Sequence, residues 1–149
     1  MVIEIDGNNL SIEGLVDVAR NFEKVKLSRV AEKRIEEARQ TLERIIREGK
    51  ITYGINTGFG DLCTQTIPEN KVEQLQMNLI RSHAVGVGKA MSNDVIRAVL
   101  LLTANSLSKG YSGVRAEIVK TIIEMLNKRL CWGEWRLGTV GTSCIGNGR

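Results

Sequence analysis

Apolar residues recur at helical spacing through most of the chain, most clearly in its first third. Residues 28–50 carry one aliphatic stripe and a charged opposite face, and Gly49 stands where a glycine commonly ends a helix. A shorter helix is predicted after Ser11, which is a good helix-capping residue. Weak alternation over residues 2–6, followed by the turn signal Gly7-Asn8-Asn9, predicts a short strand before that helix.

Three further helices are predicted in the second half of the chain. The first runs over residues 69–84, with Gln76 and His83 on its otherwise apolar inner stripe. The second follows Ser92 and reaches residue 107; it is apolar on nearly every side, which is typical of a helix in the centre of a structure. The third starts at Ser112. The chain is therefore predicted to be mainly α, with a short β element near the N-terminus.

A glycine-rich loop, ITYGINTGFGDL, interrupts this helical pattern at residues 51–62. Three glycines in seven residues hold neither a helix nor a central strand. A phosphate-binding loop would need a different order of glycines, and an acidic residue follows where a cation is wanted. Two interpretations stay open: a tight structural loop, or an active-site loop that presents Tyr53 and lets a substrate approach the backbone near Gly60. A tyrosine acts as a base only beside a positive field that lowers its pKa.

Two other segments invite a chemical interpretation without deciding it. A lone histidine on an apolar helix face is more often a core residue than a catalytic one, and the spacing at His83 does not choose between them. The segment GTVGTSC at 138–144 is by itself a loop of small residues. Its Ser143 has no histidine and aspartate partners, because His83 is the single histidine of the chain.

Composition narrows the class of protein. The chain has 149 residues, of which 42% are hydrophobic, so one folded domain is expected. Three cysteines without metal-ligand spacing, and one histidine, predict reduced thiols and no metal site. The net charge of +4 is scattered among acids, so no nucleic-acid partner is expected. Neither a membrane span nor a secretory leader is visible, and a cytoplasmic protein is expected.

Three motifs in order carry a resemblance to a known family. They are YGINTGFG at 53–60, LQMNLIRSHAVGVG at 75–88 and NSLSKGYSGVR at 105–115. Together they resemble the N-terminal part of the histidine ammonia-lyases and of the wider group of aromatic amino-acid ammonia-lyases and aminomutases. The resemblance implies the N-terminal part of the ammonia-lyase fold. It also implies non-oxidative deamination of an aromatic amino acid, histidine to urocanate, with a tyrosine ammonia-lyase or an aminomutase as the alternative.

The resemblance assigns roles to four residues. Tyr53 matches the general base that removes the β-proton of the substrate, and it resembles a residue lent across a subunit interface. Ser82 and His83 match the pocket that selects the substrate side chain. Gly60 matches a glycine whose backbone lies against the bound substrate. A Ser-His pair is typical of histidine-selective members, but some tyrosine-acting bacterial members carry it too, so the substrate stays open.

The family's cofactor is a methylidene-imidazolone (MIO) electrophile, which forms from an internal Ala-Ser-Gly triplet of the chain itself. The matching position here is Thr142-Ser143-Cys144, in which cysteine replaces the glycine that permits close approach of the backbone. Ile145 replaces the aspartate that usually follows. The MIO group is therefore not expected to form in this chain.

The differences from the family pattern lie in residues 131–149, which also hold both tryptophans and two of the three cysteines. We therefore expect a lyase-like helical domain at 1–130 and a divergent tail at 131–149. A frameshift or premature stop, an artificially shortened chain, or a natural short paralogue would each produce this pattern. The chain is expected to be truncated and inactive alone. It is expected to form a homo-oligomer or to bind a full-length paralogue; a non-enzymatic helical protein that associates in this way is the alternative function.

Overall fold

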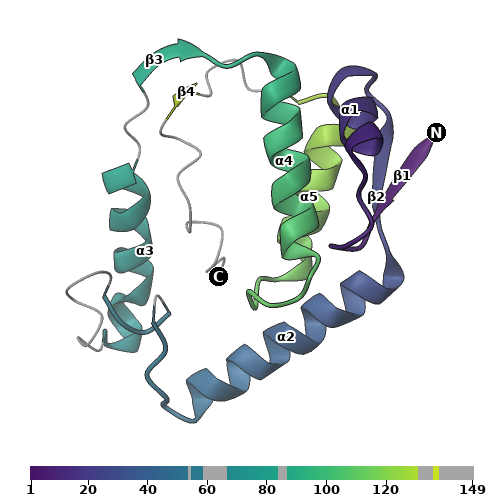
Figure 1. Cartoon of the computed structure of the whole chain (residues 1–149). Helices are drawn as coiled ribbons and strands as arrows, with labels where there is room; N and C mark the ends of the chain where they lie inside the picture. The colour runs from purple at the N-terminus through teal and green to yellow at the C-terminus, as the bar shows by residue number, and fades with distance from the viewer. Residues whose placement is uncertain (54, 59–66, 84–86, 131–135, 138–149) are drawn as a thin grey trace.

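The computed structural model describes residues 1–53, 55–58, 67–83, 87–130 and 136–137 (Figure 1). It confirms a mainly helical chain with a short strand pair at the N-terminus. The elements are β1 (Val2–Ile5), α1 (Ile12–Arg20), β2 (Lys24–Leu27), α2 (Arg29–Arg47), α3 (Glu69–His83), β3 (Val87–Ala90), α4 (Asn93–Leu107), α5 (Ala116–Asn127) and β4 (Arg136–Leu137).

The first three elements form a parallel strand–helix–strand unit. β1 and β2 pair in parallel, with Ile3 opposite Val25, and α1 is the crossover that parallel pairing requires. Ser11 begins α1 as predicted, because its Oγ accepts the backbone N–H of Gly14 at 3.1 Å. Ser28 begins α2 in the same way. Strand β2 was not predicted, because its four residues alternate but form too short a pattern to identify.

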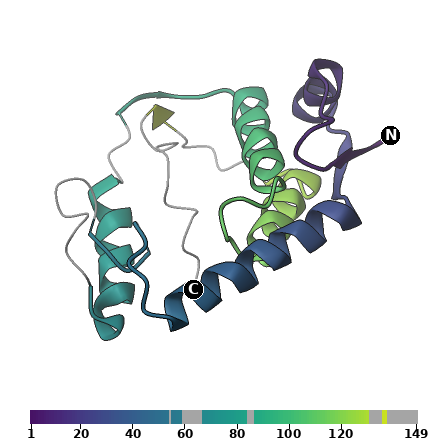
Figure 2. The same ribbon diagram turned by 60° about the horizontal axis from the view of Figure 1, so that its bottom comes forward.

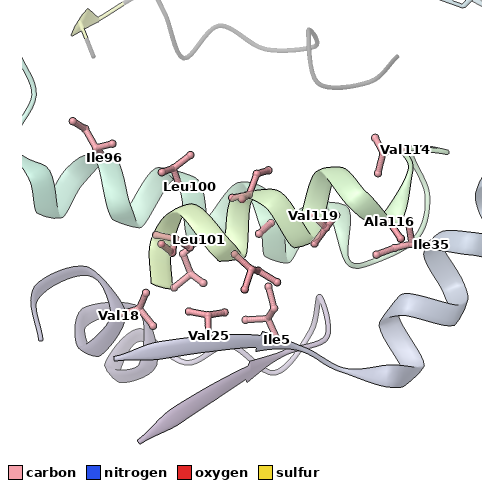
Figure 3. Close-up of a cluster of buried hydrophobic side chains, with 14 residues drawn as sticks. Ile5, Val18, Val25, Ile35, Ile96, Leu100, Leu101, Val114, Ala116 and Val119 are labelled. Atoms are coloured by element: carbon pink, nitrogen blue, oxygen red, sulfur yellow. The ribbon is translucent and has the colours of Figure 1, made fainter. Parts of the chain in front are cut away.

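The hydrophobic core lies between this unit and the two helices α4 and α5 (Figure 3). Its buried members are Ile5, Val18, Val25, Ile35, Ile96, Leu100, Leu101, Ala104, Val114, Ala116, Val119, Ile122, Ile123 and Leu126. Helix α4, which is apolar on nearly every side, is covered only in part. Val95 and Leu102 are 42% and 48% exposed, because α1 and α5 cover only part of α4.

Asn127, the last residue of α5, joins that helix to the outer edge of the sheet. Its Oδ1 accepts the backbone N–H of Val25 and its Nδ2 donates to the backbone carbonyl of Val25, both at 2.8 Å. These two bonds copy the pairing that a third strand would make. The side chain therefore satisfies the backbone N–H and carbonyl of Val25, which would otherwise be unpaired at the edge of the sheet.

The loop between α4 and α5 packs directly on α2. The helix predicted from Ser112 begins only at Ala116, because Gly110 and Gly113 adopt φ values of +77° and +65°. A Cβ at Gly110 would lie 2.9 Å from the backbone oxygen of Arg34. The glycine thus allows a close approach between the loop and α2.

Helix α3 stands apart from this core in both views (Figures 1 and 2). It spans Glu69–His83, and the predicted last residue, Ala84, lies outside the described residues. The two residues of β4 pair with β3 in antiparallel fashion, so this part of the tail lies beside the segment that follows α3. The division into residues 1–130 and 131–149 stays a prediction.

Candidate functional site

Tyr53 lies on a tight turn just after α2. The carbonyl of Thr52 accepts the backbone N–H of Ile55 at 3.1 Å and that of Asn56 at 3.3 Å, which closes one helical turn around the tyrosine. The Tyr53 side chain is 63% exposed. Thr57, which follows the turn, is fully buried. The loop is thus anchored by its threonine and presents its tyrosine outward, as the active-site interpretation of this segment requires.

Ser82 and His83 end helix α3. The Ser82 side chain is exposed, and its hydroxyl donates to the backbone carbonyl of Leu79 at 2.8 Å. Nearly two turns earlier, the Nε2 atom of Gln76 is shielded from solvent and has no hydrogen-bond acceptor among the residues that the structure describes. A buried donor of this kind is costly unless another group satisfies it.

The described bonds put the tyrosine turn and the Ser-His pair at opposite ends of α3. Asn56 of the turn accepts the backbone N–H of Ile67, two residues before the helix begins, whereas Ser82 and His83 are its last residues. A helix of this length rises about 20 Å at 1.5 Å per residue. The two groups of predicted site residues are therefore separated by the length of the helix.

The remaining predicted site residues fall outside the described part of the chain. These are Gly60 and the triplet Thr142, Ser143 and Cys144. Within the described residues, no cluster of three or more histidine, cysteine, aspartate or glutamate side chains is placed to hold a metal ion. The same residues include no helix long and apolar enough to cross a membrane.

A buried arginine is the polar residue that sequence reasoning missed most clearly. Arg97 of α4 is only 1% exposed. Its Nε and Nη2 donate to the Val18 carbonyl at 3.1 and 2.8 Å, and its Nη1 donates to the Leu126 carbonyl at 2.9 Å. Both carbonyls belong to the last turn of a helix, where the helix dipole favours a cation. Arg97 is therefore part of the framework that supports the fold, and its acceptors are distant in sequence.

Comparison with known proteins places the chain in one family. The sequence profile of the family described as "Aromatic amino acid lyase" matches residues 10–144. Histidine ammonia-lyase of Caldanaerobacter subterraneus subsp. tengcongensis is 48% identical over 141 residues, which make up 95% of this chain and 28% of that protein. The chain thus spans little more than a quarter of the length of this relative.

Solved structures with related sequences share the fold. Tyrosine aminomutase from Streptomyces globisporus is 30% identical, with a TM-score of 0.82 over 87% of this chain and 24% of that one. Ergothionase from Treponema denticola, described as an ergothioneine-degrading enzyme, is 35% identical, with a TM-score of 0.81 over 85% of this chain and 26% of that one. Similar folds of this kind therefore occur in proteins named for different substrates.

Proposed function

Because the chain belongs to the aromatic amino acid lyase family, we propose that it carries part of an ammonia-lyase site for histidine. The reaction removes ammonia without oxidation and leaves urocanate. The exposed position of Tyr53 on its closed turn is the observation that carries the proposal, because a base must reach a substrate that lies outside its own loop. The high identity to a histidine ammonia-lyase supports histidine as the substrate.

Each site residue has a proposed task. Tyr53 takes the β-proton of the substrate. Ser82 and His83 contact the side chain of the substrate, and the backbone at Gly60 lies against it. Since Tyr53 and the Ser-His pair lie at opposite ends of α3, we propose that one copy of the chain supplies the tyrosine to a pocket formed by another copy. A homo-oligomer, or a complex with a longer paralogue, would then be needed for a complete site.

The residues at 142–144 fit the MIO group poorly. That group would supply an electrophile that binds the substrate amine and makes ammonia a leaving group. Ser143 retains the hydroxyl that is lost as water, but Cys144 carries a Cβ at the residue whose nitrogen must approach the carbonyl of Thr142. We propose that the group does not form here and that the 149-residue chain alone does not deaminate histidine.

A chimera tests the site residues separately from the electrophile. Residues 1–137 of this chain replace the matching part of the Caldanaerobacter enzyme, which keeps its own triplet and everything after it. We expect the chimera to produce urocanate from histidine, measured by absorbance, and the Tyr53→Phe chimera to lose at least about 100-fold of that rate. An active Tyr53→Phe chimera would contradict the role given to the tyrosine. Tyrosine as the alternative substrate tests the selectivity.

The unaltered chain tests the electrophile. We expect an intact mass that equals the sequence mass and no urocanate above background. A mass lower by two waters, or clear turnover, would refute the proposed absence of the group. Cys144→Gly in the same chain serves as the matched variant, because it restores the residue that permits close approach.

A second candidate function is non-enzymatic association with a copy of itself or with a longer paralogue. The exposure of Val95 and Leu102 on α4 favours it, since apolar side chains on one face of a helix are commonly covered in a complex. Light scattering at micromolar concentration should give a mass above 16.5 kDa. A clean monomer would speak against this function, and Leu102→Glu should favour the monomer if the function is right.

A further inference from the structure

The side chain of Asn56 forms two hydrogen bonds on the N-terminal side of Tyr53. Its Oδ1 accepts the backbone N–H of Thr52 at 2.8 Å, and its Nδ2 donates to the backbone carbonyl of Lys50 at 3.0 Å. The two partners identify the amide atoms without ambiguity, because an N–H can only donate and a carbonyl can only accept. An asparagine is thus the residue of this length that satisfies both groups at once.

The backbone of Asn56 extends this connection in two more directions. Its N–H donates to the carbonyl of Thr52 at 3.3 Å, and its carbonyl accepts the N–H of Ile67 at 2.9 Å. Ile67 precedes Pro68, whose carbonyl accepts the N–H of Lys71 in the first turn of α3. One residue therefore ties together the end of α2, the turn that contains Tyr53 and the start of α3.

The Tyr53 side chain projects from the backbone that these bonds hold, and it is 63% exposed. The bonds that close the turn converge on Thr52 and Asn56, so a change at either residue would displace the backbone that carries the phenol. A catalytic group placed about 1 Å away from its working position loses much of its rate.

We propose that Asn56 is a positioning residue, which fixes the Tyr53 phenol in the direction needed for proton abstraction. The inference rests on the proposed role of Tyr53 as the base. The side-chain amide of Asn56 holds the backbone before the tyrosine. The backbone carbonyl of Asn56 holds the loop against Ile67, which leads into α3. Asn56 itself does not touch the substrate in this proposal.

Hydrogen exchange of backbone amides in the 149-residue chain tests the two side-chain bonds of Asn56 and needs no enzymatic activity. Asn56→Ala removes both side-chain bonds, so the Thr52 amide should exchange roughly tenfold faster. Asn56→Asp keeps an acceptor for Thr52 but loses the donor to Lys50, so the protection of Thr52 should largely remain. Asn8→Ala and Asn8→Asp are matched controls at an exposed asparagine in the turn after β1, and they should leave Thr52 unchanged.

The two tyrosines of the chain supply the readout for positioning. In protein labelled with ¹³C at tyrosine Cζ, Tyr111 is an internal reference because it is 91% exposed and lies on another loop. We expect the Tyr53 resonance to move toward that of Tyr111 in Asn56→Ala and to move less in Asn56→Asp. The amides of α4 report in the same spectra that the core remains folded.

Two results would overturn the proposal. An unchanged exchange rate of the Thr52 amide in Asn56→Ala would mean that the bond from Thr52 to the Asn56 side chain does not form in solution. Faster exchange at Thr52 with an unchanged Tyr53 resonance would mean that Asn56 supports the loop without orienting the phenol. If Asn56→Ala fails to fold, Asn56→Asp, which loses the bond to the Lys50 carbonyl, supplies the test: its Tyr53 resonance should still move toward that of Tyr111, and no movement would overturn the proposal. Neither result depends on urocanate production, so failure of this proposal is distinguishable from failure of the proposed function.

Discussion

The guanidinium of Arg97 lies over the ring of Phe22, with 4.6 Å between its central carbon and the ring centroid. Arg129 contacts the same ring at 4.8 Å. Phe22 and Arg129 each follow the C-terminal cap of a helix, and they are the two non-glycine residues with positive φ, at +58° and +55°, in the described chain. The ends of α1 and α5 therefore meet at one aromatic ring and one buried cation.

Replacing Arg97 should destabilise the fold severely. In Arg97→Met the Val18 carbonyl loses both of its guanidinium donors and the Leu126 carbonyl loses one, so we expect the free energy of unfolding to fall by about 3 kcal/mol or more. Chemical denaturation measures this. Arg20→Met is the matched control: its exposed ion pair with Asp94 should contribute less than about 0.5 kcal/mol. Equal effects of the two substitutions would contradict the role of Arg97.

Arg129 offers a test of backbone strain. Both Arg129→Gly and Arg129→Ala remove the contact with Phe22, but only glycine adopts a φ of +55° without cost. We therefore expect the glycine variant to be about 1 kcal/mol more stable than the alanine variant. Thermal unfolding of the two variants, compared with each other, decides the point. Equal stabilities would show that the left-handed conformation is not kept in solution.

Alanine substitutions at Gly110 and Gly49 distinguish the cost of backbone strain from the cost of a steric clash. Both have positive φ, at +77° and +67°, but a Cβ at Gly49 meets nothing within 4 Å, whereas one at Gly110 lies 2.9 Å from the Arg34 backbone oxygen. Gly49→Ala should cost about 1 kcal/mol from strain alone. Gly110→Ala should cost a further 1–3 kcal/mol or so, because the loop must move away from α2. Denaturant midpoints of the two variants measure the difference, which should vanish if the loop does not pack on α2.

The pH dependence of stability should contain a contribution from Asp6. The backbone N–H groups of Asn8 and Asn9 donate to its Oδ1, each at 2.9 Å, and these bonds lower the pKa of the carboxyl group below its ordinary value. A carboxyl whose pKa is lower in the folded state stabilises the fold above its unfolded pKa. That contribution is lost as the pH falls through the folded pKa.

Asp6→Asn should therefore flatten the fall in melting temperature between about pH 5 and pH 3. The measurement is the melting temperature of both proteins across this window. At neutral pH the variant should be the less stable of the two. Parallel curves for the two proteins would show that the turn after β1 does not hold its carboxylate in solution.

Local patterns predicted most of the helices but not the contacts between distant residues. The long amphipathic helix was expected at 28–50 and lies at Arg29–Arg47, because its stripe and its capping serine are all within the segment. Strand β2 was missed, since it has four residues and pairs with residues near the N-terminus. Arg97 was missed because a charged residue in a helical pattern suggests solvent, while its two acceptors lie at residues 18 and 126.

The candidate site was predicted through its motifs rather than through its geometry. Tyr53, Ser82 and His83 were named from matching segments, and their assigned roles stay predictions. The bonds of Asn56 could not be derived from the sequence, because they run to the backbone of Lys50 and Thr52 and depend on the turn that these residues form. Gly60 and the triplet at 142–144 lie outside the described residues.

Among the residues that the structure describes, the buried core cluster includes none from the segment that carries Tyr53, Ser82 and His83. Its buried apolar residues come from positions up to 35 and from 96 onward, while the Tyr53 turn and α3 lie between α2 and α4 in the chain and outside that cluster (Figures 1 and 3). Substitutions at the described, exposed positions of this segment, such as Tyr53 and Ser82, should therefore cost the core little folding free energy. Substrate preference can drift during evolution while the framework stays constant, which agrees with the range of substrates named among the solved structures with this fold.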